Sequence, residues 1–179
     1  NWWAMKNSIV KMVNSIRKPY LGLSHPISGT GLRRKVLKLL TSSNEVRTNF
    51  LIRSSSDGCK NKSKRYRLEF WENMLDSPYI LCARGTGNYS ARFYEALSIG
   101  RIPVFINTDC ILPLDEQINW KHHCLWVEAE DCNTISDKLN SFHQNLSKYE
   151  FEKLQSSNRQ IWLNKLTFGG FLKQIFYYV

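Results

Sequence analysis

The stretch Cys82–Asp109, CARGTGNYSARFYEALSIGRIPVFINTD, decides how the rest of the chain is interpreted. A short apolar run, Tyr79–Cys82, leads into a loop with two glycines. A helical pattern over Ser90–Ile99 follows, ends at Gly100, and leads directly into a second apolar run, Ile102–Ile106. A strand, a glycine-rich loop, a helix and a second strand in this order predict a βαβ unit and a parallel sheet.

The alternation of apolar runs and helical patterns continues on both sides of this unit. Apolar runs near residues 20, 50, 80, 104 and 125 predict about five strands. Amphipathic helices are predicted at Leu32–Leu40, Arg65–Leu75, Thr134–Phe142, Glu150–Trp162 and Phe168–Tyr177. On Arg65–Leu75 we expect one apolar face, made of Leu68, Trp71, Met74 and Leu75. The predicted fold class is α/β: a Rossmann-like parallel sheet flanked by helices, with further helices at the C-terminus.

Length and composition favour one domain. With 179 residues, of which 42% are hydrophobic, the chain can bury one sizeable core. Residues 1–19 are predicted as a separate N-terminal helix, stopped by Pro19, that could be the end of a domain outside this sequence. Residues 20–179 form the predicted α/β domain. No apolar stretch approaches the roughly 20 residues that span a membrane, so no transmembrane segment is expected.

The net charge of +10 is concentrated in the first third of the chain. Residues 1–67 contain 15 Lys and Arg but only two acidic residues. This excess fits a solvated face or an anionic partner: a nucleotide, a polysaccharide, nucleic acid or a membrane surface. Nucleic acid is the least supported of these, because no nucleic-acid-binding motif accompanies the charge.

The cysteines favour a reducing compartment, and no metal site is expected. The five cysteines contain no CxxC pair. His122-His123-Cys124 might suggest a metal site. Adjacent residues of a strand point to opposite faces, however, so the three cannot reach one ion without a turn.

The loop Ala83–Tyr89 is the predicted ligand site. Ligands of open parallel sheets bind beyond the carboxyl ends of the strands, where this loop lies. The free backbone N–H groups and positive end of the following helix favour a phosphate there. Gly85 and Gly87 let the backbone approach a ligand closely. Ser90 can cap the helix or donate its hydroxyl to an anion.

Three charged residues complete this predicted site. Arg84 and Arg92 can make charge-assisted contacts to phosphate oxygens. Glu95 can accept hydrogen bonds from a pair of ribose hydroxyls, or it can form a surface ion pair with Arg92 or Arg101. The pattern is neither a dinucleotide fingerprint, which needs a third glycine, nor a Walker A loop, which needs Gly-Lys-Ser/Thr.

These motifs together resemble the exostosin family, glycosyltransferase family 47. The resemblance rests on the loop Gly85–Gly87, on Ser-Ala-Arg-Phe-Tyr-Glu-Ala-Leu at Ser90–Leu97, and on Gly-Arg-Ile-Pro-Val at Gly100–Val104. Leu112-Pro113 and Trp120 follow in the family's order. The match is strong over residues 78–126 and weaker over residues 20–77.

The resemblance implies one half of a GT-B glycosyltransferase. Such enzymes have two Rossmann-like domains with the active site between them, and the C-terminal domain binds the nucleotide-sugar. Residues 20–179 would be this donor-binding domain, and an N-terminal GT-B domain would be its partner. Family members transfer the sugar with inversion of its anomeric configuration and generally lack the metal-binding DxD motif. The resemblance therefore implies a nucleotide-sugar donor, a glycan or saccharide acceptor, and no metal or other cofactor.

The family's roles carry over to individual residues of this sequence. The loop Gly85-Thr86-Gly87, with Ser90 and Arg92, would hold the diphosphate, and Glu95 the ribose. Arg33 or Arg34 would add a phosphate contact, or would belong to a solvated helix face. No catalytic base is assigned, because in this fold it usually comes from the N-terminal domain; His25 is interpreted as an ordinary loop residue.

The alternative function is a non-catalytic module that binds an anionic glycan through residues 1–67. The expected compartment is the cytoplasm, including the membrane periphery, or the Golgi lumen if the protein is eukaryotic.

Overall fold

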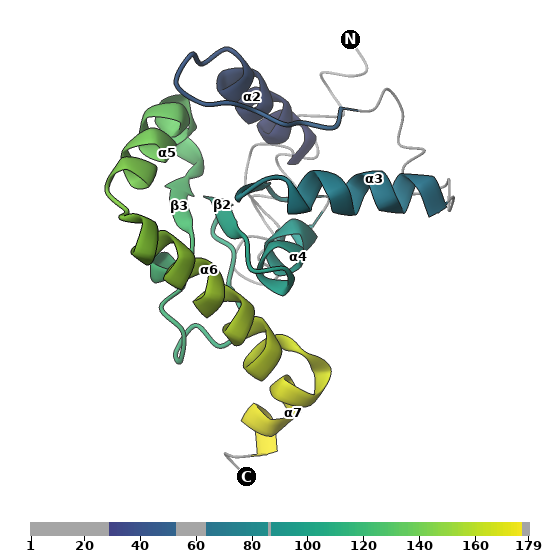
Figure 1. Ribbon diagram of the computed structural model, residues 1–179. Coiled ribbons are helices and arrows are strands. Elements are labelled where there is room, and N and C mark those ends of the chain that lie inside the picture. The colour runs from purple at the N-terminus through teal and green to yellow at the C-terminus, as the bar shows by residue number, and fades with distance from the viewer. Residues whose placement is uncertain (1–28, 53–63, 86, 177–179) are drawn as a thin grey trace, which may run out of the picture.

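The computed structural model describes residues 29–52, 64–85 and 87–176. Its centre is a parallel sheet of three strands, β1 (Tyr79–Cys82), β2 (Ile102–Asn107) and β3 (Leu125–Glu128), in the order β1-β2-β3 (Figure 1). The helices are α2 (Gly29–Thr41), α3 (Lys64–Leu75), α4 (Ala91–Ser98), α5 (Ile135–Gln144), α6 (Lys148–Ile161) and α7 (Phe168–Phe176). Shorter 3-10 turns occupy Trp120–His122 and Ala129–Thr134, and a π turn occupies Trp162–Leu166.

The strands are buried on both faces, as the unbroken apolar runs predict. Because successive side chains of a strand point to opposite faces, Val104 and Ile106 of β2 enter one core cluster and Phe105 enters the other. The first cluster lies under α2 and α5, whose Leu32, Val36, Ile135 and Leu139 fill it. The second lies under α4, centred on Phe93. The predicted α/β class is therefore confirmed, with helices on both faces of the sheet.

The predicted number of strands is not confirmed. Strands near residues 80, 104 and 125 are present, but residues 46–52 form no strand. Val46 and Phe50 pack against the first core cluster, while the backbone carbonyl of Asn49 accepts a hydrogen bond from the Asn73 side chain at 2.8 Å. Within the described ranges, residues 46–52 are thus held by side-chain contacts and not by backbone hydrogen bonds to a neighbouring strand. The predicted strand near residue 20, the helix in residues 1–19 and His25 lie outside the described residues.

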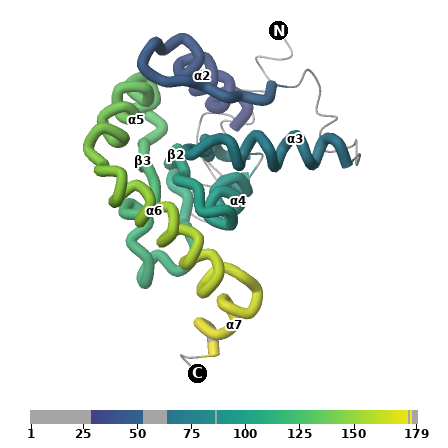
Figure 2. Tube along the Cα trace, viewed as in Figure 1, coloured from purple at the N-terminus to yellow at the C-terminus, as the bar shows by residue number. Residues whose placement is uncertain are grey.

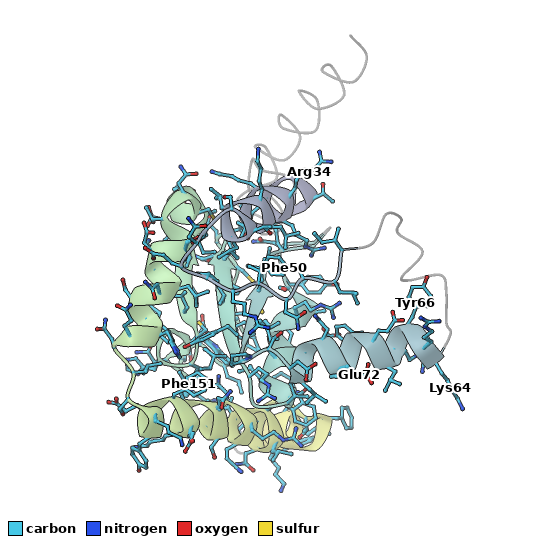
Figure 3. All side chains as sticks on the ribbon, turned by 45° about the horizontal axis from the view of Figure 1, so that its top comes forward. Arg34, Phe50, Lys64, Tyr66, Glu72 and Phe151 are labelled. Carbon is cyan, nitrogen blue, oxygen red and sulfur yellow. The ribbon has the colours of Figure 1, made fainter. Side chains whose placement is uncertain are left out.

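The predicted apolar face of α3 is largely unburied. Met74 is buried, but Leu68 and Leu75 are 59% and 50% exposed. Met74 and the half-buried Phe70 pack against the second core cluster, whereas Lys64 and Tyr66 at the N-terminal end of α3 lie away from the sheet (Figure 3). Helical periodicity predicted the helix correctly, but it cannot tell how much of the apolar face finds a partner within the described residues.

The end of α4 positions the next strand. Gly100 has a φ of +67°, a left-handed conformation that glycine adopts without steric cost. The backbone N–H of Gly100 donates to Leu97, and that of Arg101 donates to Ala96 at 2.8 Å. This Schellman-type ending turns the chain directly into β2, as the predicted stop at Gly100 requires.

A buried asparagine joins α6 to the sheet. Helix α6 runs from α5 to α7 along one side of the molecule (Figure 2). Asn158 is fully buried, and its Nδ2 donates to the carbonyls of Arg101 and His123 at 3.1 and 3.0 Å. Its Oδ1 accepts from Nδ1 of His123 at 3.1 Å, which assigns the proton to that ring nitrogen. Cys124 Sγ donates to Trp120, and His122 contacts Asn119. The side chains of the His122-His123-Cys124 run are thus held by separate partners.

This contact makes stability depend on pH. Burial lowers the pKa of His123, and the hydrogen bond to Asn158 opposes this shift only in part. As the pH falls, the unfolded chain takes up the proton first, near its ordinary pKa of about 6.5. The contribution of His123 to the free energy of unfolding is therefore expected to be complete above that pH. It should decrease as the pH falls from there to the lower pKa of the folded state. Urea unfolding at several pH values measures this; a His123→Gln variant with an unchanged pH dependence would contradict the assignment.

Candidate functional site

The loop between β1 and α4 forms the candidate site, and α2 supports it from one side. The backbone N–H of Gly85 donates to the carbonyl of Tyr89 at 3.0 Å and closes the loop. Nη2 of Arg33 donates to the carbonyls of Ala83 and Arg84, both at 3.4 Å. Gly29, the first residue of α2, lies so close that a Cβ there would collide with the Gly85 carbonyl oxygen. The loop is therefore fixed by the first turns of α2.

Arg84 is the most unusual residue of the site. It is only 7% exposed, yet among the described residues Nε and Nη1 of its guanidinium have no hydrogen-bond partner. Burial lowers the pKa of Arg84. Buried donors of a cation that lack partners are costly, so these two nitrogens make Arg84 a candidate ligand-binding residue.

Ser90 adds an unpaired hydroxyl next to this loop. It is the N-cap residue of α4, but its side chain makes no capping hydrogen bond, and its buried Oγ has no partner in the part of the chain that the structure describes. The first of its two predicted roles, as helix cap, is therefore not realised. The first turn of α4 contains no acidic residue, so its positive end is not neutralised locally. Arg84, Ser90 and the start of α4 together offer unused donors to an anion.

Arg92 and Glu95 form an ion pair with each other on the surface of α4. The Arg92 guanidinium also lies 3.9 Å from the ring centre of Phe70 on α3. This is the surface pair foreseen as the alternative for Glu95. Both residues stand near the loop, but they are already partnered, whereas the buried nitrogens of Arg84 are not.

The remaining predicted residues have distinct positions. Arg33 binds the backbone of the loop, whereas Arg34 lies on the outer side of α2 (Figure 3) and lines a surface cavity of about 580 Å³. That cavity shares only Arg33 with the candidate site. Gly87 lies against the side chain of Tyr89, since a Cβ added to this glycine would be 2.8 Å from the ring edge. Thr86 lies outside the described residues.

The loop after β2 also belongs to the site, which the sequence motifs did not reveal. Thr108 Oγ1 donates to Asn88 Oδ1 at 2.6 Å, and Asn88 Nδ2 donates to the carbonyl of Asp109 at 3.0 Å. Burial raises the pKa of the Cys110 thiol, and the nearby Arg84 opposes this shift. One available signal was position: Thr108–Cys110 follow a predicted parallel strand at its carboxyl end.

Fold and site define an α/β domain with a loop at the carboxyl edge of a parallel sheet, and this loop contains unpaired hydrogen-bond donors of Arg84 and Ser90. The model of the exostosin GT47 domain matches residues 16–142, and the chain belongs to this family. An exostosin-1 homolog of Caenorhabditis elegans is 32% identical over 107 residues, which cover 59% of this chain and 27% of the relative.

Two plant proteins are also similar. A probable glucuronosyltransferase of Oryza sativa subsp. japonica is 33% identical over 79 residues, covering 44% of this chain and 18% of the relative. A probable beta-1,4-xylosyltransferase of Arabidopsis thaliana is 30% identical over 79 residues, covering 44% and 19%. The chain thus spans about a quarter or less of these relatives. A family of transferases does not favour the alternative of a non-catalytic glycan-binding module.

Within the ranges that the structure describes, no helix is long and apolar enough to cross a membrane. The same ranges contain four free cysteines, Cys82, Cys110, Cys124 and Cys132.

Proposed function

We propose that this chain is the donor-binding half of an inverting GT-B glycosyltransferase, which transfers a sugar from a nucleotide-sugar to a glycan or saccharide acceptor. The observation that carries the proposal is that Nε and Nη1 of Arg84 and Oγ of Ser90, in one loop, are buried without a hydrogen-bond partner among the described residues. A diphosphate supplies the acceptor oxygens that these groups lack. Names of the relatives add glucuronosyl and xylosyl transfer as candidate chemistries for the parent enzyme.

The proposed roles follow the geometry. Arg84, Ser90 and the N-terminus of α4 bind the diphosphate, and Gly85 and Gly87 let the backbone approach it. Thr86, which lies outside the described residues, keeps its place in the proposed loop from the sequence alone. Arg33 positions the loop through its two carbonyl contacts. Glu95, oriented by Arg92, accepts hydrogen bonds from the ribose hydroxyls. Arg34 stands outside this set and is assigned to the outer surface of α2.

In the proposed reaction an acceptor hydroxyl attacks the anomeric carbon from the face opposite the diphosphate. A carbon–oxygen bond to the acceptor forms while the bond to the diphosphate oxygen breaks, so the configuration inverts. A general base, which we assign to an N-terminal GT-B domain, takes the hydroxyl proton. Positive groups on this chain, above all Arg84, stabilise the charge that develops on the departing diphosphate.

Thermal melting tests the proposal. A ligand present at 100 times its Kd raises the free energy of unfolding by about 2.7 kcal/mol. For a domain of this size that corresponds to roughly 5–10 °C in Tm. We expect such a shift with at least one member of a panel of common UDP- and GDP-sugars. A panel that leaves the melting curve unchanged would sink the proposal.

The role of Glu95 is tested through the ribose. We expect Glu95→Ala to weaken binding of the preferred nucleoside diphosphate about tenfold, since hydrogen bonds to charged groups contribute about 1.5–3 kcal/mol. The wild-type chain should also prefer the ribonucleotide over its 2′-deoxy analogue, and Glu95→Ala should lose this preference. Glu72→Ala, which removes an exposed carboxylate on α3, serves as the matched control. Equal discrimination by Glu95→Ala and wild type would remove Glu95 from the site.

The proposed compartment rests on the organisms in which the relatives occur. They are animal and plant proteins, which favours the Golgi lumen over the cytoplasm for the parent enzyme.

A further inference from the structure

The loop that follows β2 is held in an unfavourable backbone conformation. Asp109 and Leu114 both have a φ of +56°, and they are the only non-glycine residues with positive φ in the described ranges. They bracket the segment 110–113. L-residues adopt this conformation at a cost, Asp more readily than Leu, and strain of this kind concentrates at functional sites.

The strained loop is fastened to the candidate donor site. Asn88, in the loop after β1, accepts from Thr108 and donates to the carbonyl of Asp109. Asn107 accepts from the backbone N–H of Cys110 at 3.3 Å. Because β1 and β2 are neighbours in the parallel sheet, their carboxyl-end loops stand side by side. A ligand bound by Arg84 therefore reaches the loop that contains Asp109.

The carboxylate of Asp109 is free to bind such a ligand. The residue is exposed, and within the described ranges only its backbone carbonyl has a hydrogen-bond partner. A carboxylate repels phosphate oxygens, so it cannot serve the diphosphate itself. It accepts hydrogen bonds from hydroxyl groups, which a sugar supplies.

We propose that Asp109 binds hydroxyl groups of the transferred sugar and is a specificity-determining residue for the donor. The inference rests on the proposed function, because it requires the diphosphate at Arg84 and Ser90. The ribose is assigned to Glu95 on α4. The loop after β2 can therefore contact the sugar, which is attached to the other end of the diphosphate. An anionic side chain there favours neutral, hydroxyl-bearing edges of the sugar.

The test compares one nucleotide with and without its sugar. The full 179-residue chain is titrated calorimetrically with the tightest-binding UDP- or GDP-sugar and with UDP or GDP alone. We expect Asp109→Asn to weaken binding of the sugar-nucleotide about tenfold while changing the affinity for the bare nucleotide less than about twofold. Asparagine removes the charge but tolerates positive φ, so the backbone is preserved. Asp115→Asn removes a neighbouring carboxylate outside the site and should bind both ligands like wild type.

The outcomes separate the two proposals. Wild-type affinity of Asp109→Asn for the sugar-nucleotide overturns the inference alone, as does an equal loss for both ligands. Failure of the wild-type chain to bind any UDP or GDP species overturns the proposed function and the inference with it. If Asp109→Asn does not fold, Asp109→Gly, which relieves the strained φ, must show the same selective loss.

Discussion

Replacing Arg84 with methionine is expected to abolish nucleotide binding without destabilising the protein. The guanidinium has two buried nitrogens without partners, so the folded chain gains little from it in the absence of a ligand. Burying an unpaired charge opposes folding, and an apolar side chain of similar length is neutral or stabilising at such positions. We expect Arg84→Met to melt at the wild-type temperature or a few degrees above it, equivalent to about 1 kcal/mol.

The loss of binding should be large. Two hydrogen bonds to a charged phosphate contribute about 1.5–3 kcal/mol each, so affinity for the nucleoside diphosphate should fall at least about 100-fold. Arg47→Met, which removes an arginine of the irregular segment 46–52, should bind normally. Calorimetric titration and melting curves give both quantities. A strongly destabilised Arg84→Met would mean that the guanidinium is already paired in the free protein, and retained affinity would mean that the phosphate binds elsewhere.

Gly29→Ala is expected to destabilise the protein strongly. The added Cβ would collide with the Gly85 carbonyl oxygen and lie 2.9 Å from that of Arg84. Both obstacles are backbone atoms, so a side-chain movement cannot relieve the contact, and α2 must shift. We expect a loss of about 3 kcal/mol in the free energy of unfolding, or roughly 6–12 °C in Tm.

A second glycine provides the matched control. Gly169 lies within α7, and a Cβ added there would meet only open space. Gly169→Ala is therefore expected to keep or raise the melting temperature, by up to about 1 kcal/mol of helix stabilisation. The displaced α2 should also move Arg33 away from the loop carbonyls, so Gly29→Ala should bind nucleotide more weakly than Gly169→Ala. A Tm of Gly29→Ala within about 1–2 °C of wild type, or about 0.5 kcal/mol, would show that α2 does not hold the loop.

Local patterns were sufficient for the central βαβ unit. The apolar runs at β1 and β2, the helix of α4 and its stop at Gly100 all depend on neighbours in sequence, and each was predicted correctly. The predicted strand near residue 50 failed for a physical reason. A short apolar run does not reveal whether its backbone forms hydrogen bonds with a neighbouring strand or with a side chain, as at Asn49.

The candidate site also combines features that local sequence predicts with features that it does not. Sequence motifs selected Arg84 and Ser90, but their lack of partners depends on burial by residues far away in the chain. Pairing of Arg92 with Glu95 was foreseeable, because residues three apart share a helix face. The contact of Gly29 with Gly85 and the strained φ of Asp109 were not, since neither leaves a local pattern.

The order of the strands along the chain also bears on how the protein folds. Tyr79 pairs with Ile102 and Val104 with Leu125, separations of 102 − 79 = 23 and 125 − 104 = 21 residues. Gly29 meets Gly85 across 85 − 29 = 56 residues, and closing that longer loop costs about 0.8 kcal/mol more entropy than closing the first. The sheet is thus favoured to nucleate first, with α2 docking later. The loop around Arg84 then takes its final shape in a late step, and the strain of a substitution at Gly29 appears mainly as faster unfolding.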